Sequence, residues 1–179
     1  MKEIIKLETK HLYLRQWREE DLSPYAQLTS NQEVMKFFPK LLTTEQSDVA
    51  ALKFQKLIAH RGWGFWAVEE KSTGKFMGYA GLHAPSTVFP FSPCVEIAWR
   101  VEEHCWENGY VLELGETIVK FAFKEASLEE IVYFSSIHNK RAESVVSALA
   151  FKKEKNTFAH PMVGEEDFLS EHYLYRLVK

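Results

Sequence analysis

The sequence predicts a single α/β domain of the mixed α+β kind, with a central sheet of about six to seven strands flanked by about four helices. Three observations lead to this prediction. The 179 residues suit one domain, and 46% of them are hydrophobic, which is enough to form one core. Runs with period-two alternation are separated by runs with helical spacing. A strand, a helix and a strand follow one another in the middle of the chain, which predicts two neighbouring parallel strands.

The first strand and the first helix are expected within the first 31 residues. Residues 11–16 place Leu12 and Leu14 on one face, as in a half-buried strand. Ser23 precedes Pro24, a pattern typical of an N-cap followed by proline at the first helical position. We therefore expect a short helix that starts after Ser23 and ends near residues 30–31.

A longer helix and a hairpin are expected next. Thr43 and Gln46 have the spacing of a capping box, so a second helix should start there and end at Gly62. Residues 65–82 contain two runs rich in aromatic and β-branched side chains on either side of the turn residues 72–74. This pattern predicts an antiparallel hairpin.

The central segment predicts a parallel unit. Residues 85–93 carry three prolines and should form a loop that borders a substrate cleft. Residues 94–101 alternate as a strand, residues 109–126 have the spacing of an amphipathic helix, and residues 131–136 read as another strand. In such a unit the first turn of the helix lies at the carboxyl ends of the two parallel strands.

The end of the chain predicts one more helix and a closing pair of strands. Asn139 can cap a helix whose apolar face is formed by Ala142, Val145, Val146 and Leu149. Residues 151–158 and 173–178 could then form an antiparallel pair that completes the sheet.

Charge and cysteine content exclude several classes. The net charge is -3, so we expect no binding to nucleic acid through a general basic field. No run of about 18 apolar residues predicts a membrane span. Cys94 and Cys105 lack partners at metal-ligand spacing and cannot form a disulfide scaffold, so we expect no metal site and a cytoplasmic protein.

The order strand, short loop, Gly109, helix predicts an anion site. Backbone N–H groups and the positive end of the helix dipole converge there, and a pyrophosphate would fit. On this fact alone the signal is weak, because a single glycine before a helix is more often a simple turn.

Four motifs in order resemble the GNAT superfamily of N-acetyltransferases, and specifically its ribosomal-protein-alanine-acetyltransferase-like branch. The opening residues 8–15 resemble that branch's Glu-Thr-x-Arg-Leu-x-Leu-Arg start, and residues 95–100 resemble its fourth strand. Residues 106–113 resemble its acyl-CoA loop, usually Trp-Gly-x-Gly-Tyr-Ala-x-Glu, and residues 139–151 resemble its downstream Asn-x-x-Ser segment. The resemblance covers nearly the whole chain.

The resemblance implies a GNAT fold in which an amine attacks acetyl-CoA directly, without an acyl-enzyme. Acetyl-CoA would be the cosubstrate, with its thioester at backbone N–H groups of the 97–101 strand and its pyrophosphate at those of residues 107–110. Asn139 would bond the pantetheine arm or the strand beside it. The cofactor-binding residues expected on this basis are Ile97, Ala98, Trp99, Arg100, Val101, Trp106, Glu107, Asn108, Gly109, Tyr110, Val111 and Asn139.

Glu96 is the preferred general base, and Asn139 is grouped with it as catalytic. A carboxylate in a partly apolar strand beside the thioester can have its pKa raised toward the working pH. The alternative is a structural salt bridge from Glu96 to Arg100 on the same face of the strand. No general acid stands out; the candidates are Ser135, Ser136, His138 and Tyr175.

Departures from the family pattern leave a second function open. Glu107 replaces a usual glycine, Val111 a usual glycine or alanine, and Ala142 a frequent serine. A carboxylate that points toward a phosphate would weaken binding, whereas one that faces solvent would matter little. The alternative to an active enzyme is therefore a weak or inactive acyl-CoA-binding module. The sequence does not identify the amine acceptor, and it leaves a homodimer open.

Several other side chains have two interpretations. His83 could touch substrate or be an ordinary polar residue at a strand end. Aromatic residues between positions 63 and 91 could line an acceptor pocket or belong to the core; these are Trp63, Phe65, Trp66, Phe89 and Phe91. Cys105 is interpreted as a packing residue because no His and Asn/Asp arrangement supports thiol catalysis.

Overall fold

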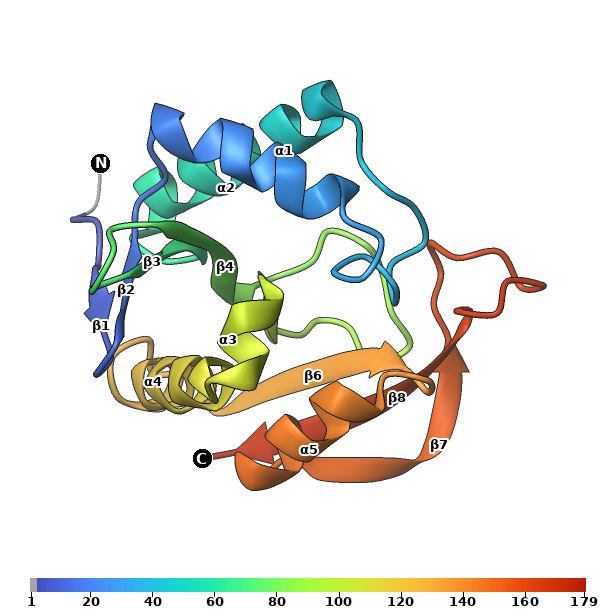
Figure 1. Cartoon of the computed structure of the whole chain (residues 1–179). Coiled ribbons are helices and arrows are strands. Elements are labelled where there is room, and N and C mark those ends of the chain that lie inside the picture. Colours follow the sequence, from blue (N-terminus) through green and yellow to red (C-terminus); the bar gives the residue numbers. More distant parts are fainter. Residues whose placement is uncertain (1–2) are drawn as a thin grey trace.

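A computed structural model describes residues 3–179 and confirms the mixed α/β architecture (Figure 1). Eight strands form one sheet in the order β1-β2-β3-β4-β5-β6-β8-β7. The strands are β1 (Leu7–Glu8), β2 (Leu12–Arg15), β3 (Phe65–Glu70), β4 (Phe76–His83), β5 (Glu96–Val101), β6 (Glu130–Ser136), β7 (Lys152–Ala159) and β8 (Glu171–Val178). The helices are α1 (Leu22–Ser30), α2 (Thr44–Arg61), α3 (Glu103–Glu107), α4 (Tyr110–Lys124) and α5 (Lys140–Ala148), and a 3₁₀ turn spans Glu19–Asp21. Within residues 3–179 no helix has the length and apolar character needed to cross a bilayer.

Two elements exceed the expected number. Strand β1 has only two residues, which is too short to show a period, and it pairs antiparallel with β2. Helix α3 has five residues and occupies the segment that was expected to be a loop. Such short elements are set by their neighbours rather than by local pattern, so the sequence alone could not predict them.

The start of α1 differs from the prediction. The helix begins at Leu22 directly after the 3₁₀ turn, with Asp21 rather than Ser23 at its N-cap position. The Asp21 carboxylate accepts hydrogen bonds from the Arg15 guanidinium at 2.7 and 2.9 Å and from the Arg18 backbone N–H at 2.8 Å. These bonds nucleate the turn upstream of Ser23, so that Pro24 falls inside the first turn of the helix.

The capping box and the hairpin are confirmed. The Gln46 N–H donates to Thr43 Oγ1 at 3.3 Å, and the Thr43 N–H donates to Gln46 Oε1 at 3.2 Å. Strands β3 and β4 pair antiparallel around a turn that contains residues 72–74. Local side-chain chemistry therefore fixed both elements, as the sequence predicted.

Helices cover the sheet from two sides. Helices α1 and α2 pack together on one side, and α4 and α5 lie on the other, with α5 beside β7 and β8 (Figure 1). Helix α4 turns a fully buried apolar face to the sheet, formed by Val111, Leu114, Ile118, Phe121 and Ala122. Cys105 is fully buried within the same core, and burial raises the pKa of its thiol to about 12, which fits a packing role.

Strands β5 and β6 separate soon after they meet. Strand β4 pairs with β5 over six residues, whereas the parallel pairing of β5 with β6 is confined to Glu96 and Val132. The Val132 N–H donates to the Val95 carbonyl at 2.9 Å at this closed end. The rest of β5 therefore has no partner strand on the β6 side, and a cavity opens there.

Candidate active site

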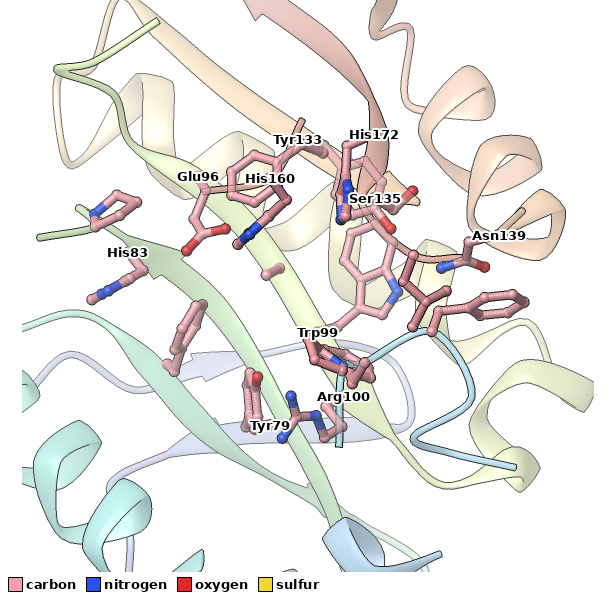
Figure 2. Close-up of a pocket in the computed structure, with 18 of the residues that line it drawn as sticks. Tyr79, His83, Glu96, Trp99, Arg100, Tyr133, Ser135, Asn139, His160 and His172 are labelled. Carbon is pink, nitrogen blue, oxygen red and sulfur yellow. The ribbon is translucent and has the colours of Figure 1, made fainter. Parts of the chain in front are cut away.

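A cavity of about 380 Å³ lies where β5 and β6 part (Figure 2). Its wall includes most of the predicted residues of β5, together with one residue of α3 and the residue before α5: Glu96, Ala98, Trp99, Arg100, Val101, Trp106 and Asn139. Pro85, Ser86, Thr87 and Phe89 of the proline-rich loop also line it, as the sequence predicted. Ile97 points into the core and is fully buried, so only its backbone can serve the site.

Glu96 lies at the closed end of the cavity without a cationic partner. Burial raises the pKa of Glu96 to about 8. The expected alternative, a salt bridge to Arg100, is absent from the ion pairs of residues 3–179. Figure 2 shows the two side chains apart, with Arg100 beside Tyr79 and Glu96 toward His83 and His160. A carboxylate with this pKa can take up a proton near neutral pH.

His83 faces the cavity from the neighbouring strand. It pairs with Glu96 across β4 and β5, and its ring lies 5.1 Å from the ring of Phe65. Burial, with smaller effects from Arg61 and Lys53, lowers the pKa of His83 to about 4. His83 is therefore neutral at pH 7 and adds no charge opposite Glu96. Phe65 and Phe89 also line the cavity, whereas the fully buried Trp66 belongs to the core.

Two of the four predicted anion donors are already hydrogen-bonded within the chain. Helix α3 fills the expected loop, and the N–H groups of Asn108 and Gly109 donate to the carbonyls of His104 and Trp106 at 3.2 and 3.3 Å. The first turn of α4 starts at Tyr110, after Gly109 in the left-handed conformation. Free N–H donors are therefore expected at Tyr110 and Val111 rather than at positions 107–109.

The Glu107 side chain is exposed at the end of α3. We expect Glu107→Gln, which removes the charge and keeps the length, to tighten acetyl-CoA binding by about threefold or less, because water and salt screen an exposed carboxylate. The measurement is the dissociation constant by calorimetry at two salt concentrations. Any gain should shrink as salt rises, and a tightening of more than tenfold would contradict the solvent-facing position.

Asn139 caps α5 and reaches the cavity at the same time. Its Oδ1 accepts the Ala142 N–H at 3.3 Å, so the amide nitrogen is the group that could meet a ligand. We expect Asn139→Ala to lower the free energy of unfolding by about 1 kcal/mol, because the cap is lost. Asn139→Asp should keep the cap while it removes the amide donor. If only the alanine variant weakens acetyl-CoA binding, Asn139 acts through the cap and not by contact.

The four candidate acids are separated by the fold. Only Ser135 lines the cavity; Ser136 is buried, His138 stacks on Phe168 with ring centroids 3.7 Å apart, and Tyr175 is buried beside Tyr133. Ser135 is thus the one candidate of this set that a leaving group in the cavity could reach.

Of an aromatic compartment at the Glu96 end, the sequence pointed only to Phe89, whereas Phe134, His160 and His172 were not predicted. His160, which directly follows β7, and His172 of β8 lie 4.8 Å apart and pack with Phe89 and Phe134, whose rings are 4.8 Å apart. Burial lowers the pKa of both histidines, that of His172 to about 4. Only the register of β7 against β8 brings these residues together, and no local pattern in the sequence encodes that register.

Known proteins with similar sequences and folds agree with this geometry. A family model described as an acetyltransferase (GNAT) domain matches residues 11–152. The uncharacterized N-acetyltransferase YoaA of Bacillus subtilis is 25% identical over 150 residues, which cover 83% of each chain. An acetyltransferase (GNAT family) from Bacillus anthracis superposes with a TM-score of 0.79 at 19% identity, covering 97% of this chain and 98% of that one.

A second solved structure belongs to the branch that the sequence resembles. The ribosomal-protein-S5-alanine acetyltransferase from Vibrio fischeri superposes with a TM-score of 0.76 at 18% identity, covering 97% of this chain and 96% of that one. At such identities the structures show the fold, and the family model shows the kinship. Because that model spans well over half of the sequence, the chain belongs to the GNAT acetyltransferase family.

Proposed function

We propose that this protein transfers an acetyl group from acetyl-CoA to a primary amine by direct attack. The observation that carries the proposal is the parting of β5 from β6, with Glu96 at the closed end and the first turn of α4 beyond the open end. In this proposal Glu96 is the base, the free edge of β5 supplies backbone donors, and the N-terminus of α4 is the anion site.

The residues present fit acetyl-CoA. The edge of β5 over residues 97–101 has no strand partner toward β6, so its N–H groups on that side are available to a thioester carbonyl. Asn139 offers an amide nitrogen to the pantetheine arm. The N-terminus of α4 provides donors and a favourable dipole for the pyrophosphate.

Glu96 would accept the proton that the ammonium of the acceptor must lose, directly or through one water molecule. The amine nitrogen then forms a bond to the thioester carbon, and β5 N–H groups stabilise the negative charge on the carbonyl oxygen. The carbon–sulfur bond breaks, the nitrogen loses its second proton, and the CoA thiolate takes up a proton. Ser135, one of several hydroxyl side chains that line the cavity, would relay this proton from the nitrogen to the sulfur. Products are the acetylated amine and the free CoA thiol.

Two linked assays test the proposal. Acetyl-CoA at 100 times its dissociation constant should add about 2.7 kcal/mol to the free energy of unfolding, seen as a rise in Tm. A free-thiol assay across a panel of primary amines should then show CoA release that depends on both protein and amine. No shift at millimolar acetyl-CoA would overturn the proposal, and binding without release for every amine would instead support the non-catalytic module.

A further inference from the structure

The cavity walls carry an uneven set of charges. Three cationic side chains line the cavity, Lys53, Arg100 and Arg141, whereas Glu96 is the single carboxylate among its lining residues within residues 3–179. A polyamine would bring several positive charges to a wall that is already cationic. An acceptor that carries a negative group in addition to its amine fits this wall better.

Arg100 is one of these cations, and among residues 3–179 it has no carboxylate partner. The buried guanidinium of Arg15, in contrast, is neutralised by two carboxylates. Its nitrogen atoms lie 2.7 Å from an oxygen of Asp21 and 2.5 Å from an oxygen of Glu69. No ion pair of residues 3–179 involves Arg100, and its buried Nε has no hydrogen-bond partner. An unsatisfied buried donor on a charged group is costly, and a ligand that bonds the other N–H groups of this guanidinium would offset part of that cost.

Aromatic rings hold the guanidinium in place. Its central carbon lies 3.9 Å from the ring centroid of Phe38 and 5.6 Å from that of Tyr79. Tyr79 is the residue of β4 directly opposite Arg100. Stacking of this kind orients a guanidinium, and the Tyr25 hydroxyl also lies beside it. Because Nε is buried, the terminal N–H groups of Arg100 are the ones that would meet a carboxylate in two parallel hydrogen bonds.

The spacing along β5 places the groups of a small acceptor. Glu96, Ala98 and Arg100 share one face of the strand, with successive Cα atoms about 6.6 Å apart and the outer two Cα atoms on the order of 13 Å apart. In the proposed function the amine lies near Ala98, between the base and the guanidinium. Its carboxylate must then be within a few bonds of the amine, as in a free amino acid.

The aromatic compartment indicates which side chain the acceptor carries. It is formed by Phe89, Phe134, His160 and His172. It lies at the Glu96 end of the same cavity and is lined by neutral rings (Figure 2). Such a compartment excludes charge and takes an apolar or aromatic group.

We infer that the acceptor is a free α-amino acid with an apolar or aromatic side chain, whose carboxylate binds Arg100 while its side chain enters the aromatic compartment. This inference rests on the proposed function, because it places the amine beside the thioester. It separates this protein's acceptor from polyamines and from the N-termini of proteins, which lack a carboxylate at that distance from the amine.

The test compares amines that differ only in the anionic group. CoA release is measured with L-phenylalanine, L-leucine and L-tryptophan, with their amides, and with the corresponding tripeptides that continue as Gly-Gly. For at least one of the three, the acid should exceed its amide and its tripeptide in kcat/KM by about 10- to 100-fold, the range expected for hydrogen bonds to a charged group.

Variants of Arg100 link this preference to the guanidinium. Arg100→Gln should lower kcat/KM for the preferred acid at least tenfold more than it lowers kcat/KM for the amide of that acid, and Arg100→Lys should restore part of the difference. Arg61→Gln is the matched control, since Arg61 also lacks a carboxylate partner but stacks on Trp63 outside the cavity wall. Equal rates for acids and amides, or release only with tripeptides or diamines, would overturn the inference and leave the proposed function intact. An absence of acetyl-CoA binding would instead defeat the proposed function.

Discussion

Replacing Glu96 by glutamine is expected to lower kcat about 100- to 10,000-fold, the usual contribution of a general base, while the dissociation constant of acetyl-CoA changes by less than about threefold. Glutamine keeps the size of the side chain and removes the proton-accepting carboxylate. Glu96 forms no ion pair in residues 3–179, so its replacement breaks no salt bridge. The measurement is single-turnover CoA release at saturating acetyl-CoA with the best acceptor from the panel.

The pH dependence gives an independent check on Glu96. Its pKa is raised to about 8, so the carboxylate form of the wild type should increase, and kcat with it, as the pH rises toward 8. The folded protein holds this proton more tightly than the unfolded chain, whose pKa is near 4.5, so the contribution of Glu96 to stability should fall as the pH rises from about 4.5 through 8. His83 and His172 have lowered pKa values and contribute in the opposite direction, between about pH 4 and 6.5. Glu96→Gln should lose this contribution and the rise of kcat that depends on the carboxylate, so its Tm should fall less than the wild-type Tm between pH 7 and pH 9. Full activity of this variant at pH 7 would place the base elsewhere.

Replacing Gly81 by alanine is expected to destabilise the fold by about 3 kcal/mol or more, which lowers Tm by roughly 6–12 °C in a domain of this size. Gly81 has a φ of +156°, and a Cβ there would lie 2.0 Å from the Gly64 carbonyl oxygen and 2.9 Å from Trp66 Cε3. The contact with backbone leaves no flexible group that could move away. Gly81 is also the partner of Ala98 on β5, so a shift of β4 would reach the cavity.

Gly164→Ala is the matched control for this variant. A Cβ at Gly164 would meet nothing within 4 Å, and its φ lies outside the range that favours glycine. Its Tm should stay within about 2 °C of the wild type, as expected for a surface substitution. If Gly81→Ala and Gly164→Ala have the same Tm, the close contact between Gly81 and the Gly64 carbonyl oxygen is not present in the protein.

The sequence predicted those parts of the fold that depend on local chemistry. The Thr43 capping box, the amphipathic face of α4 and the Asn139 cap are all contained within a few residues of the chain. The short α3 could not be predicted, because its five residues carry no period and depend on packing, with Cys105 buried beneath. Because α3 uses the N–H groups of Asn108 and Gly109, the donors expected for a pyrophosphate are those of Tyr110 and Val111 at the start of α4.

The sequence could predict which site residues share a face of one strand, but not which contacts they make with neighbouring strands. Alternation on β5 placed Glu96 and Arg100 on one face, which the structure confirms. Whether Glu96 and Arg100 form a salt bridge depended on neighbouring elements that the β5 sequence does not specify. The Arg100 guanidinium packs on Tyr79 of β4 and on Phe38 of the 31–43 loop. His160 and His172 meet only through strand register, which depends on contacts far apart in sequence.

A crystal structure of the protein with acetyl-CoA is the most direct test of the central claim. We predict that the pantetheine arm lies between β5 and β6, that the thioester carbonyl accepts a hydrogen bond from a backbone N–H of residues 97–101, and that the pyrophosphate meets the N–H groups of Tyr110 and Val111. Acetyl-CoA bound outside the cavity between β5 and β6, or with its pyrophosphate away from the N-terminus of α4, would contradict the account.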